Sequence, residues 1–261
     1  MKALLSKGTA LLICLFIFTN MYAGDKVSFL KRQFTSSNGY KLNYRILYPV
    51  NYTPGKSYPV ILFLHGAGER GNDNEAQLVH GGDMLASYGN QSKYPAIVIA
   101  PQCPEGEKWA YYKQPSENNG IREFPVASAA TPAMNAIKEM LDCYISKGLV
   151  DTRRIYVTGL SMGGMGTFVC RYPKFFAAAA PICGGVNLKR LEQFKGKTGF
   201  SIYHGSADNI VDPEFSREAY ETLRKIHADV RYKEYPNVKH NSWDNAFAEP
   251  DFISWMFQHS L

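Results

Sequence analysis

Beyond its first two dozen residues, the sequence lacks an apolar run of the roughly 20 residues that a membrane-spanning helix needs. It also lacks a block of Lys and Arg, because the formal net charge of +6 is scattered along the chain. There is no CxxC pair and no His/Cys grouping at the spacing of zinc ligands. These absences argue against stable membrane insertion, nucleic-acid binding and a structural metal site.

The N-terminus reads as a secretory signal peptide over residues 1–23. Lys2 and Lys7 give it a positive start, Ala10–Phe18 is a short apolar core, and Ala23 is a small residue before the predicted cut. The core is too short to span a bilayer. We therefore expect an exported protein, periplasmic or secreted, whose cleavage position is defined to within a residue or two.

Removal of this segment changes the cysteine and charge counts. Cys14 leaves with it, and so do two positive charges, which lowers the net charge from +6 to +4. Cys14 also ends a faint lipoprotein-like signal, but Ile13 is too bulky for the residue before a lipidated cysteine. Residues 24–261 suit one α/β domain.

Cysteine is scarce in the remaining chain. Cys103, Cys143, Cys170 and Cys183 allow three complete disulfide pairings, and the sequence does not choose among them. Export makes disulfides chemically accessible, whereas the alternative is that some of these residues are buried free thiols.

Alternating strand and helix patterns predict the fold. Ser36–Gly39 joins two alternating segments as an antiparallel hairpin, and continuous apolar runs such as Pro59–Leu64 indicate strands covered on both faces. The fold class is therefore α/β: a mostly parallel central sheet with an N-terminal antiparallel hairpin and helices on both faces. The predicted strands are 27–34, 40–48, 59–64, 96–100, 155–157, 177–182, 200–203 and 230–235, and the predicted helices are 132–147, 165–171, 213–226 and 250–259.

Two long irregular segments, Gly71–Tyr94 and Gln102–Val126, each follow a predicted strand. Loops at the carboxyl ends of parallel strands line the ligand crevice, so both are expected at its rim. The second holds Trp109, Tyr111, Tyr112 and Phe124. These aromatic side chains either shape a substrate pocket or pack the loop against the rest of the domain.

Gly159–Gly163 is the most informative motif, because its GxSxG pattern lies between the strand-like run Ile155–Val157 and a helical pattern. A serine in this setting occupies a strained turn that exposes its hydroxyl. Ser161 is therefore the predicted nucleophile.

A serine nucleophile needs a base and a group that orients the base. In this strand–turn–helix arrangement the chain order is Ser, acid, His. His240 lies between the last predicted strand and the last predicted helix, which makes it the candidate base. The acid is Asp208, directly after a strand, or Asp212, which precedes Pro213 and is well explained as a helix cap. We favour Asp208.

The oxyanion of an acyl-transfer transition state needs N–H donors. Met162 follows the nucleophile and supplies one. Ala67, in the glycine-rich turn Leu64–Gly71, is expected to supply the other. His65 is expected to support this turn by hydrogen bonding rather than to act in catalysis.

With these motifs in place, the chain resembles secreted bacterial serine esterases of the α/β-hydrolase fold. More narrowly, it resembles the esterases grouped around polyhydroxybutyrate depolymerases, feruloyl esterases and acetyl xylan esterases. It also resembles the dienelactone-hydrolase, phospholipase/carboxylesterase and "predicted peptidase" relatives. Matching stretches include Ala100–Pro104 and His240–Asp244. One departure concerns the dienelactone hydrolases, whose nucleophile is a cysteine where this chain has Ser161.

The resemblance implies roles for individual residues. Ser161, Asp208 and His240 match the family triad, and Ala67 and Met162 match its oxyanion positions. Trp243, Trp109 and Gln102 fall in stretches where such enzymes shape the substrate pocket.

The resemblance also implies an activity that needs no cofactor. It is that of an exported carboxylic-ester hydrolase removing feruloyl or acetyl groups from plant polysaccharide. The substrate partner would be a small ester or an acylated oligosaccharide, and the oligomeric state stays open. One alternative is a phospholipase/carboxylesterase of small esters. A second is a prolyl-oligopeptidase-like peptidase, although the chain has no room for the large filtering domain of those enzymes. A third is a non-catalytic binding protein, which the complete triad disfavours.

Overall fold

A computed structural model describes residues 27–113, 123–125, 129–168, 172, 174–192, 194 and 196–261. The predicted signal peptide, Cys170 and Val126 lie outside these residues. Among the described cysteines, Cys103, Cys143 and Cys183 are free thiols. None of the described helices is long and apolar enough to span a membrane.

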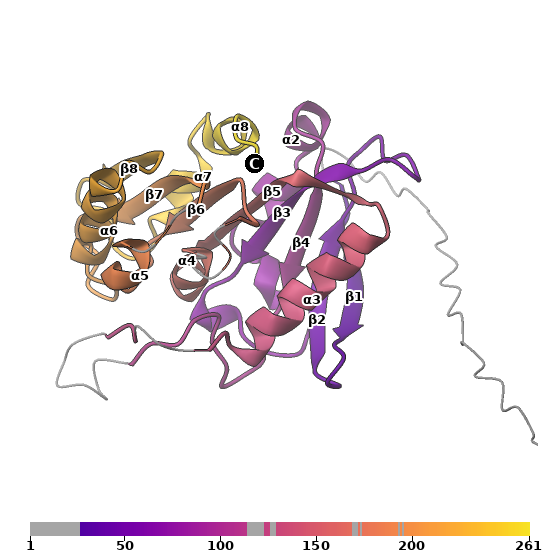
Figure 1. Cartoon of the computed structure of the whole chain (residues 1–261), viewed down its shortest axis with the longest axis horizontal. Helices are drawn as coiled ribbons and strands as arrows, with labels where there is room; N and C mark the ends of the chain where they lie inside the picture. The colour runs from indigo at the N-terminus through magenta and orange to yellow at the C-terminus, as the bar shows by residue number, and fades with distance from the viewer. Residues whose placement is uncertain are drawn as a thin grey trace, which may run out of the picture.

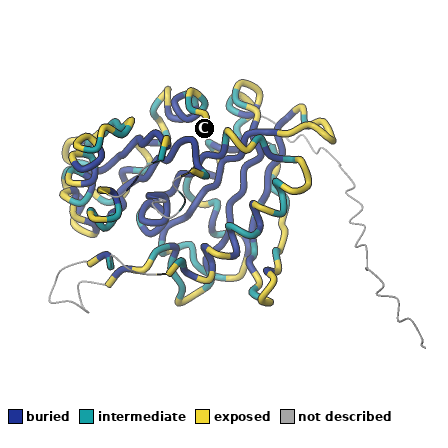
Figure 2. The backbone as a smooth tube through the Cα atoms, in the orientation of Figure 1, coloured by how far each residue is buried: buried dark blue, intermediate teal, exposed yellow. Residues whose placement is uncertain are grey.

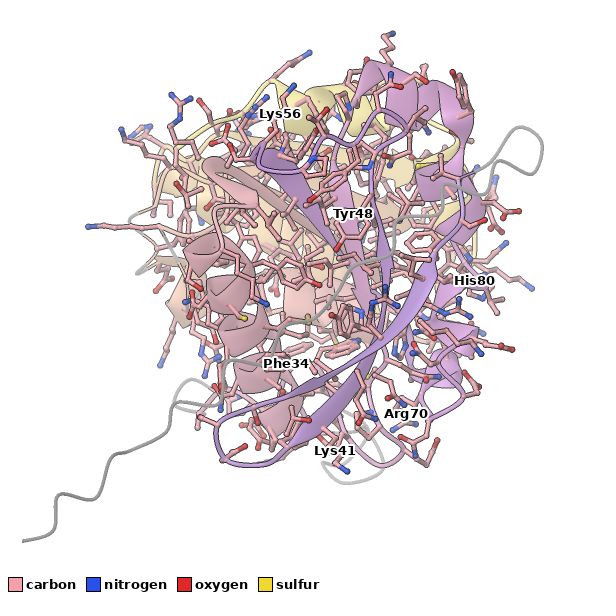
Figure 3. All side chains as sticks on the ribbon, turned by 90° about the vertical axis from the view of Figure 1, so that its right-hand side faces the viewer. Phe34, Lys41, Tyr48, Lys56, Arg70 and His80 are labelled. Atoms are coloured by element: carbon pink, nitrogen blue, oxygen red, sulfur yellow. The ribbon has the colours of Figure 1, made fainter. Side chains whose placement is uncertain are left out.

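One eight-stranded sheet forms the centre of the molecule, in the order β1-β2-β4-β3-β5-β6-β7-β8 (Figure 1). The β1/β2 and β2/β4 pairs are antiparallel, and the other five pairs are parallel. This confirms the predicted fold class, including the N-terminal hairpin, which lies toward the viewer in Figure 3. The strands are β1 Leu30–Thr35, β2 Lys41–Leu47, β3 Tyr58–Leu64, β4 Ile97–Pro101, β5 Val150–Leu160, β6 Ala178–Ile182, β7 Gly199–Gly205 and β8 Val230–Tyr235.

Helices cover both faces of the sheet, which explains why strands such as β3 are buried along their whole length (Figure 2). Val60 and Leu62 of β3 belong to a core shared with α3, α4, α5 and α6, whereas Ile61 and Phe63 point into a second core with α1, α7 and α8. The helices are α1 Gly82–Ala86, α2 Tyr88–Lys93, α3 Pro132–Ser146, α4 Met162–Thr167, α5 Leu188–Glu192, α6 Glu214–Lys225, α7 Trp243–Phe247 and α8 Phe252–Phe257, with 3-10 turns η1 Ala67–Glu69 and η2 Ala76–Leu78.

Helix α3 shows how local sequence sets these boundaries. The Thr131 hydroxyl accepts a hydrogen bond from the Met134 N–H, and Pro132 occupies the first helical position, where its missing N–H costs nothing. The helix ends before Gly148, which has a φ of 71°.

The structure adds α5 and α7, which were not predicted, and it differs from the predicted segments most clearly at three places. Gly71–Tyr94 is not wholly irregular, because it contains η2, α1 and α2, each too short to produce a periodic pattern. β5 starts at Val150, which pairs with Tyr58, rather than at Ile155. The polar residues 151–154 interrupt the apolar pattern, so the sequence did not reveal this earlier start. α4 starts at Met162, directly after the predicted nucleophile, rather than at Met165.

Candidate active site

Ser161 lies between β5 and α4 in a strained backbone conformation, with φ 53° and ψ −115°. A left-handed φ is uncommon for a residue with a side chain, and such strain concentrates at functional sites. Gly163 permits the turn, because a Cβ there would stand 1.9 Å from the Leu64 carbonyl oxygen. The motif therefore forces the Ser161 hydroxyl out of the tight strand–helix junction.

The structure brings Ser161, His240 and Asp208 into one hydrogen-bonded chain. Ser161 Oγ is 2.9 Å from His240 Nε2, and His240 Nδ1 is 2.7 Å from Asp208 Oδ2. Because a carboxylate oxygen only accepts, the imidazole proton lies on Nδ1. Nε2 is then left with a lone pair that can accept the serine proton.

The loops carrying the acid and the base are held against each other. The Ala207 N–H donates to the Val238 carbonyl over 2.9 Å. At Gly205 a Cβ would stand 2.3 Å from that same carbonyl oxygen, so only glycine allows this approach. The close contact fixes the separation of Asp208 and His240.

Asp208 is buried and receives four hydrogen bonds. Its Oδ1 accepts from the N–H groups of Ile210 and Val211, and its Oδ2 accepts from His240 and from His204 Nε2 at 3.1 Å. Burial alone would raise the pKa of this carboxyl, but the hydrogen bonds from His204, His240 and the two N–H groups outweigh burial and hold the pKa well below its usual range. The acid therefore stays ionised.

Sequence reasoning missed His204. Its Nε2 faces two acceptors, Asp208 Oδ2 and the Val211 carbonyl, so the proton lies on Nε2 and the Ser216 hydroxyl donates to Nδ1. The signal was its position at the end of β7, four residues before the acid.

Asp212, the alternative acid, lies at the start of α6. Its Oδ1 accepts from the Glu214 N–H over 2.9 Å, which is a capping contact. No hydrogen bond joins it to the chain from Asp208 to Ser161 in the described part of the protein, so the geometry favours Asp208.

The predicted oxyanion positions lie at two helical starts beside Ser161. Ala67 is the first residue of η1 and Met162 is the first of α4. The first N–H groups of a helical segment have no partner within it. A Cβ built on Gly66 would stand 3.7 Å from Ser161 Cβ, which places the η1 turn directly against the nucleophile.

His65 supports this turn, as the sequence indicated. Its Nδ1–H donates to the Gly66 carbonyl at 2.6 Å, and its Nε2 accepts from the Cys103 N–H at 2.9 Å. The ring thereby ties the end of β3 to the end of β4. Burial lowers the pKa of His65 to about 4, because the charged form loses its hydration.

This neutral histidine predicts acid sensitivity. The unfolded chain binds a proton at His65 near pH 6.5, whereas the folded chain does so only near pH 4. Stability should therefore fall as the pH drops through this window, by about 3 kcal/mol from His65 at the lower end. Urea denaturation should be measured at several pH values between 4 and 6.5. The free energy of unfolding should depend less on pH in His65→Gln than in the wild type. His227→Asn, at an exposed site, should follow the wild type, and parallel curves for all three proteins would contradict the assignment.

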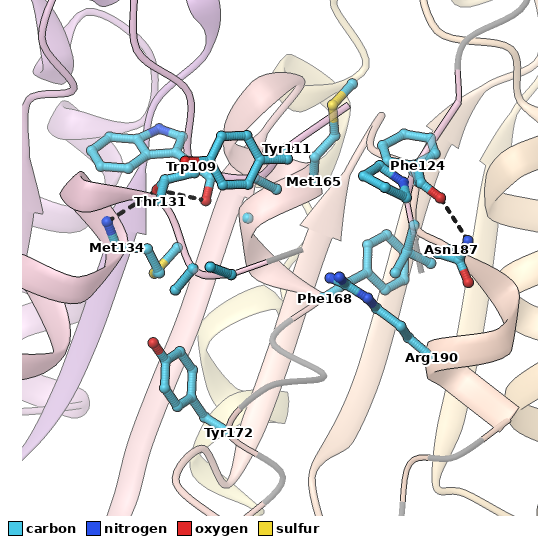
Figure 4. Close-up of a pocket in the computed structure, with 17 residues that line it drawn as sticks. Trp109, Tyr111, Phe124, Thr131, Met134, Met165, Phe168, Tyr172, Asn187 and Arg190 are labelled. Carbon is cyan, nitrogen blue, oxygen red and sulfur yellow. Dashed lines mark hydrogen bonds between the residues drawn. The ribbon is translucent and has the colours of Figure 1, made fainter. Parts of the chain in front are cut away.

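A cavity lies against α4, between α3 and α5 (Figure 4). Trp109 and Phe124 lie on opposite sides of it, and both come from the second long loop. Met165 also lines it, one turn beyond Ser161, whose carbonyl oxygen is 3.0 Å from the Met165 N–H. Asn187 and Arg190 supply polar groups, whereas Ser161 and His240 are not among the lining residues.

The three residues suggested to contact substrate have different surroundings. Trp109 lines the cavity and donates its Nε1–H to the His65 carbonyl. Trp243 packs edge-on against the His240 ring, with centroids 5.5 Å apart. The Gln102 expectation needs correction: its side chain is buried and bonded to Asn74, Glu69 and Asp73, so it fastens the first long loop instead of facing a ligand.

The sheet order, the serine at a strained strand–helix turn and the following Asp and His loops define the α/β-hydrolase fold with the geometry of a serine hydrolase. The chain belongs to the phospholipase/carboxylesterase family, whose model matches residues 50–254. Membership of this family supports the expectation that the chain is a carboxylic-ester hydrolase.

Individual relatives agree with this assignment. The chain is 29% identical to poly(3-hydroxyalkanoate) depolymerase C of Paucimonas lemoignei over 65% of its own length and 45% of that protein. It is 29% identical to feruloyl esterase B of Neurospora crassa over 61% and 62% of the two chains. A thermostable esterase structure superposes with a TM-score of 0.78 at 34% identity, over 89% of this chain and 63% of that one. The chain thus spans about half to two thirds of these relatives.

Proposed function

We propose that the protein hydrolyses carboxylic esters by two-step acyl transfer on Ser161. The observation that carries this proposal is the continuous hydrogen-bonded chain from Ser161 through His240 to Asp208. The lone pair of His240 Nε2 faces the serine hydroxyl, and the ionised Asp208 stabilises the imidazolium that forms.

In the first step Ser161 Oγ attacks the ester carbonyl while His240 Nε2 takes its proton. The N–H groups of Ala67 and Met162 hold the oxyanion, and each such donor lowers the barrier by about 3–4 kcal/mol. His240 then protonates the leaving alcohol. In the second step it activates a water that releases the acid and restores the serine.

The substrate class we propose is acylated plant polysaccharide, with feruloyl favoured over acetyl. The aromatic-walled cavity beside α4 supports this choice, since Trp109 and Phe124 line it and its wall begins one turn from Ser161. The similarity to a feruloyl esterase points the same way.

An assay series tests this specificity. Methyl ferulate, p-nitrophenyl acetate and acetylated xylan should be compared as substrates of the pure protein. Filling the cavity with Ala130→Phe should lower the ferulate-to-acetate ratio of kcat/KM about tenfold, because the added ring occupies the acyl space. Ala248→Phe, at an exposed position after α7, is the matched control and should keep the ratio. If Ala130→Phe kept the wild-type ratio, the cavity would be rejected as the acyl site. Faster cleavage of peptide amides than of any ester would indicate a peptidase.

We also propose that the protein is exported, on the strength of the charged start, the short apolar core and Ala23. The mature protein recovered from the periplasm or the medium of its producing cell should begin within a residue or two of Gly24. Recovery of the full-length chain from the cytoplasm alone would contradict export.

A further inference from the structure

A buried thiol lies directly behind the catalytic candidates. Cys183 follows the last residue of β6, is fully buried and has a left-handed φ of 41°. Its Sγ, an Asp208 carboxylate oxygen and a His240 ring nitrogen all lie within 4.8 Å of one another. The acyl-transfer steps give this thiol no task.

The three groups form a mixed sulfur, nitrogen and oxygen donor set, which suits zinc and other thiophilic divalent cations. A fourth polar group lies beside them. Ser242 Oγ is buried and makes no hydrogen bond of ordinary geometry within the described part of the chain, although it lies close enough to Cys183 to lower the pKa of that thiol.

The distances require only small movements. Ligands about 2.0–2.3 Å from a zinc ion lie roughly 3.3–3.8 Å apart in a tetrahedron. His240 Nδ1 and Asp208 Oδ2, now 2.7 Å apart, would separate slightly, while Cys183 Sγ would approach by about 1 Å or less. The side chain of His240 is 20% exposed and that of Asp208 is fully buried, so the ion would enter past the imidazole.

We propose that Cys183, Asp208 and His240 form an inhibitory site for a thiophilic divalent cation such as Zn²⁺. A cation on Nδ1 forces the remaining imidazole proton onto Nε2, because a neutral imidazole has one N–H and one lone pair. Nε2 then donates to Ser161 and no longer accepts its proton. The bound ion thereby switches off the base by selecting the wrong tautomer.

Proton balance gives this mechanism a signature. The Nδ1 proton moves to Nε2, and the Cys183 thiol releases its proton, so binding to the neutral-imidazole form frees one proton per cation. Burial and the Asp208 charge raise the pKa of the thiol. The Ser161 N–H and the Ser242 hydroxyl lower it, but their effect is smaller. Cation binding should therefore be accompanied by proton release.

The first test is inhibition of p-nitrophenyl acetate hydrolysis by Zn²⁺, with each protein normalised to its own activity without metal. The wild type should lose at least 90% of its activity (about tenfold) and recover it with EDTA. Cys183→Ser should shift the midpoint at least tenfold higher, since a hydroxyl is a poor zinc ligand. Cys143→Ser, at the half-exposed free cysteine of α3, is the matched control and should follow the wild type. Equal midpoints for wild type and Cys183→Ser would overturn the proposal.

The second test needs no activity, so it separates failure of this site from failure of the esterase proposal. Cd²⁺ added to Ser161→Ala should produce the ultraviolet charge-transfer band of a cadmium thiolate, which a Cys183→Ser substitution in that background should abolish. His240→Gln should weaken the Cd²⁺ affinity at least tenfold and provides the test should Cys183→Ser not fold. A band that depends on Cys143 alone, or one unaffected by His240→Gln, would overturn the site.

Discussion

Replacing Ser161 with alanine is expected to lower kcat by about 10⁴- to 10⁶-fold on any ester that the protein hydrolyses. The acyl-enzyme cannot form without Oγ, and the remaining rate comes only from binding and the oxyanion donors. Steady-state kinetics with p-nitrophenyl acetate measures the effect. Thermal unfolding should stay close to that of the wild type, because alanine keeps the Cβ at the strained turn.

Ser254→Ala is the matched control for this variant. Ser254 is a partly exposed serine of α8 whose hydroxyl bonds locally, to the Asp251 carbonyl. Its loss should change kcat less than about twofold, as expected of a surface substitution. Retention of substantial activity by Ser161→Ala would show that another group is the nucleophile.

Replacing Asp208 with asparagine should lower kcat by about 10⁴-fold. The amide removes the negative charge that stabilises the imidazolium, and its NH₂ group can donate to His240 Nδ1. The imidazole then carries its proton on Nε2 and cannot accept from Ser161.

Asp212→Asn decides between the two acids that the sequence offered. Asn remains a good capping residue, so the variant should keep both its stability and its activity to within a few-fold. If Asp212→Asn were severely impaired and Asp208→Asn only mildly, the residue that orients His240 would be Asp212 rather than Asp208.

Much of this site could be predicted because chain order and local chemistry carry it. The GxSxG turn identifies Ser161, and the position of His240 between the last strand and the last helix identifies the candidate base. Asp208 was separated from Asp212 by the capping argument, and the structure shows the Asp212 carboxylate at the start of α6. Each of these inferences uses residues that are neighbours in sequence.

Other features depend on side chains that meet only when strands are placed side by side. Cys183 directly follows β6 and His204 is the penultimate residue of β7, and both approach Asp208 from these parallel neighbouring strands. Gln102 looked like a rim residue but turns inward to fasten the loop after β3. Local pattern does not say which way a loop side chain turns, so these roles required coordinates.

The bonding of Asp208 has a consequence for the timing of turnover. Three of its four hydrogen bonds come from His204, Ile210 and Val211, which take no part in proton transfer. While His240 transfers protons among the serine, the leaving alcohol and water in the proposed reaction, these three hydrogen bonds hold the carboxylate in place. The rearrangement needed in each cycle is thereby confined to a single imidazole ring, and the negative end of the site is already set when every new substrate arrives.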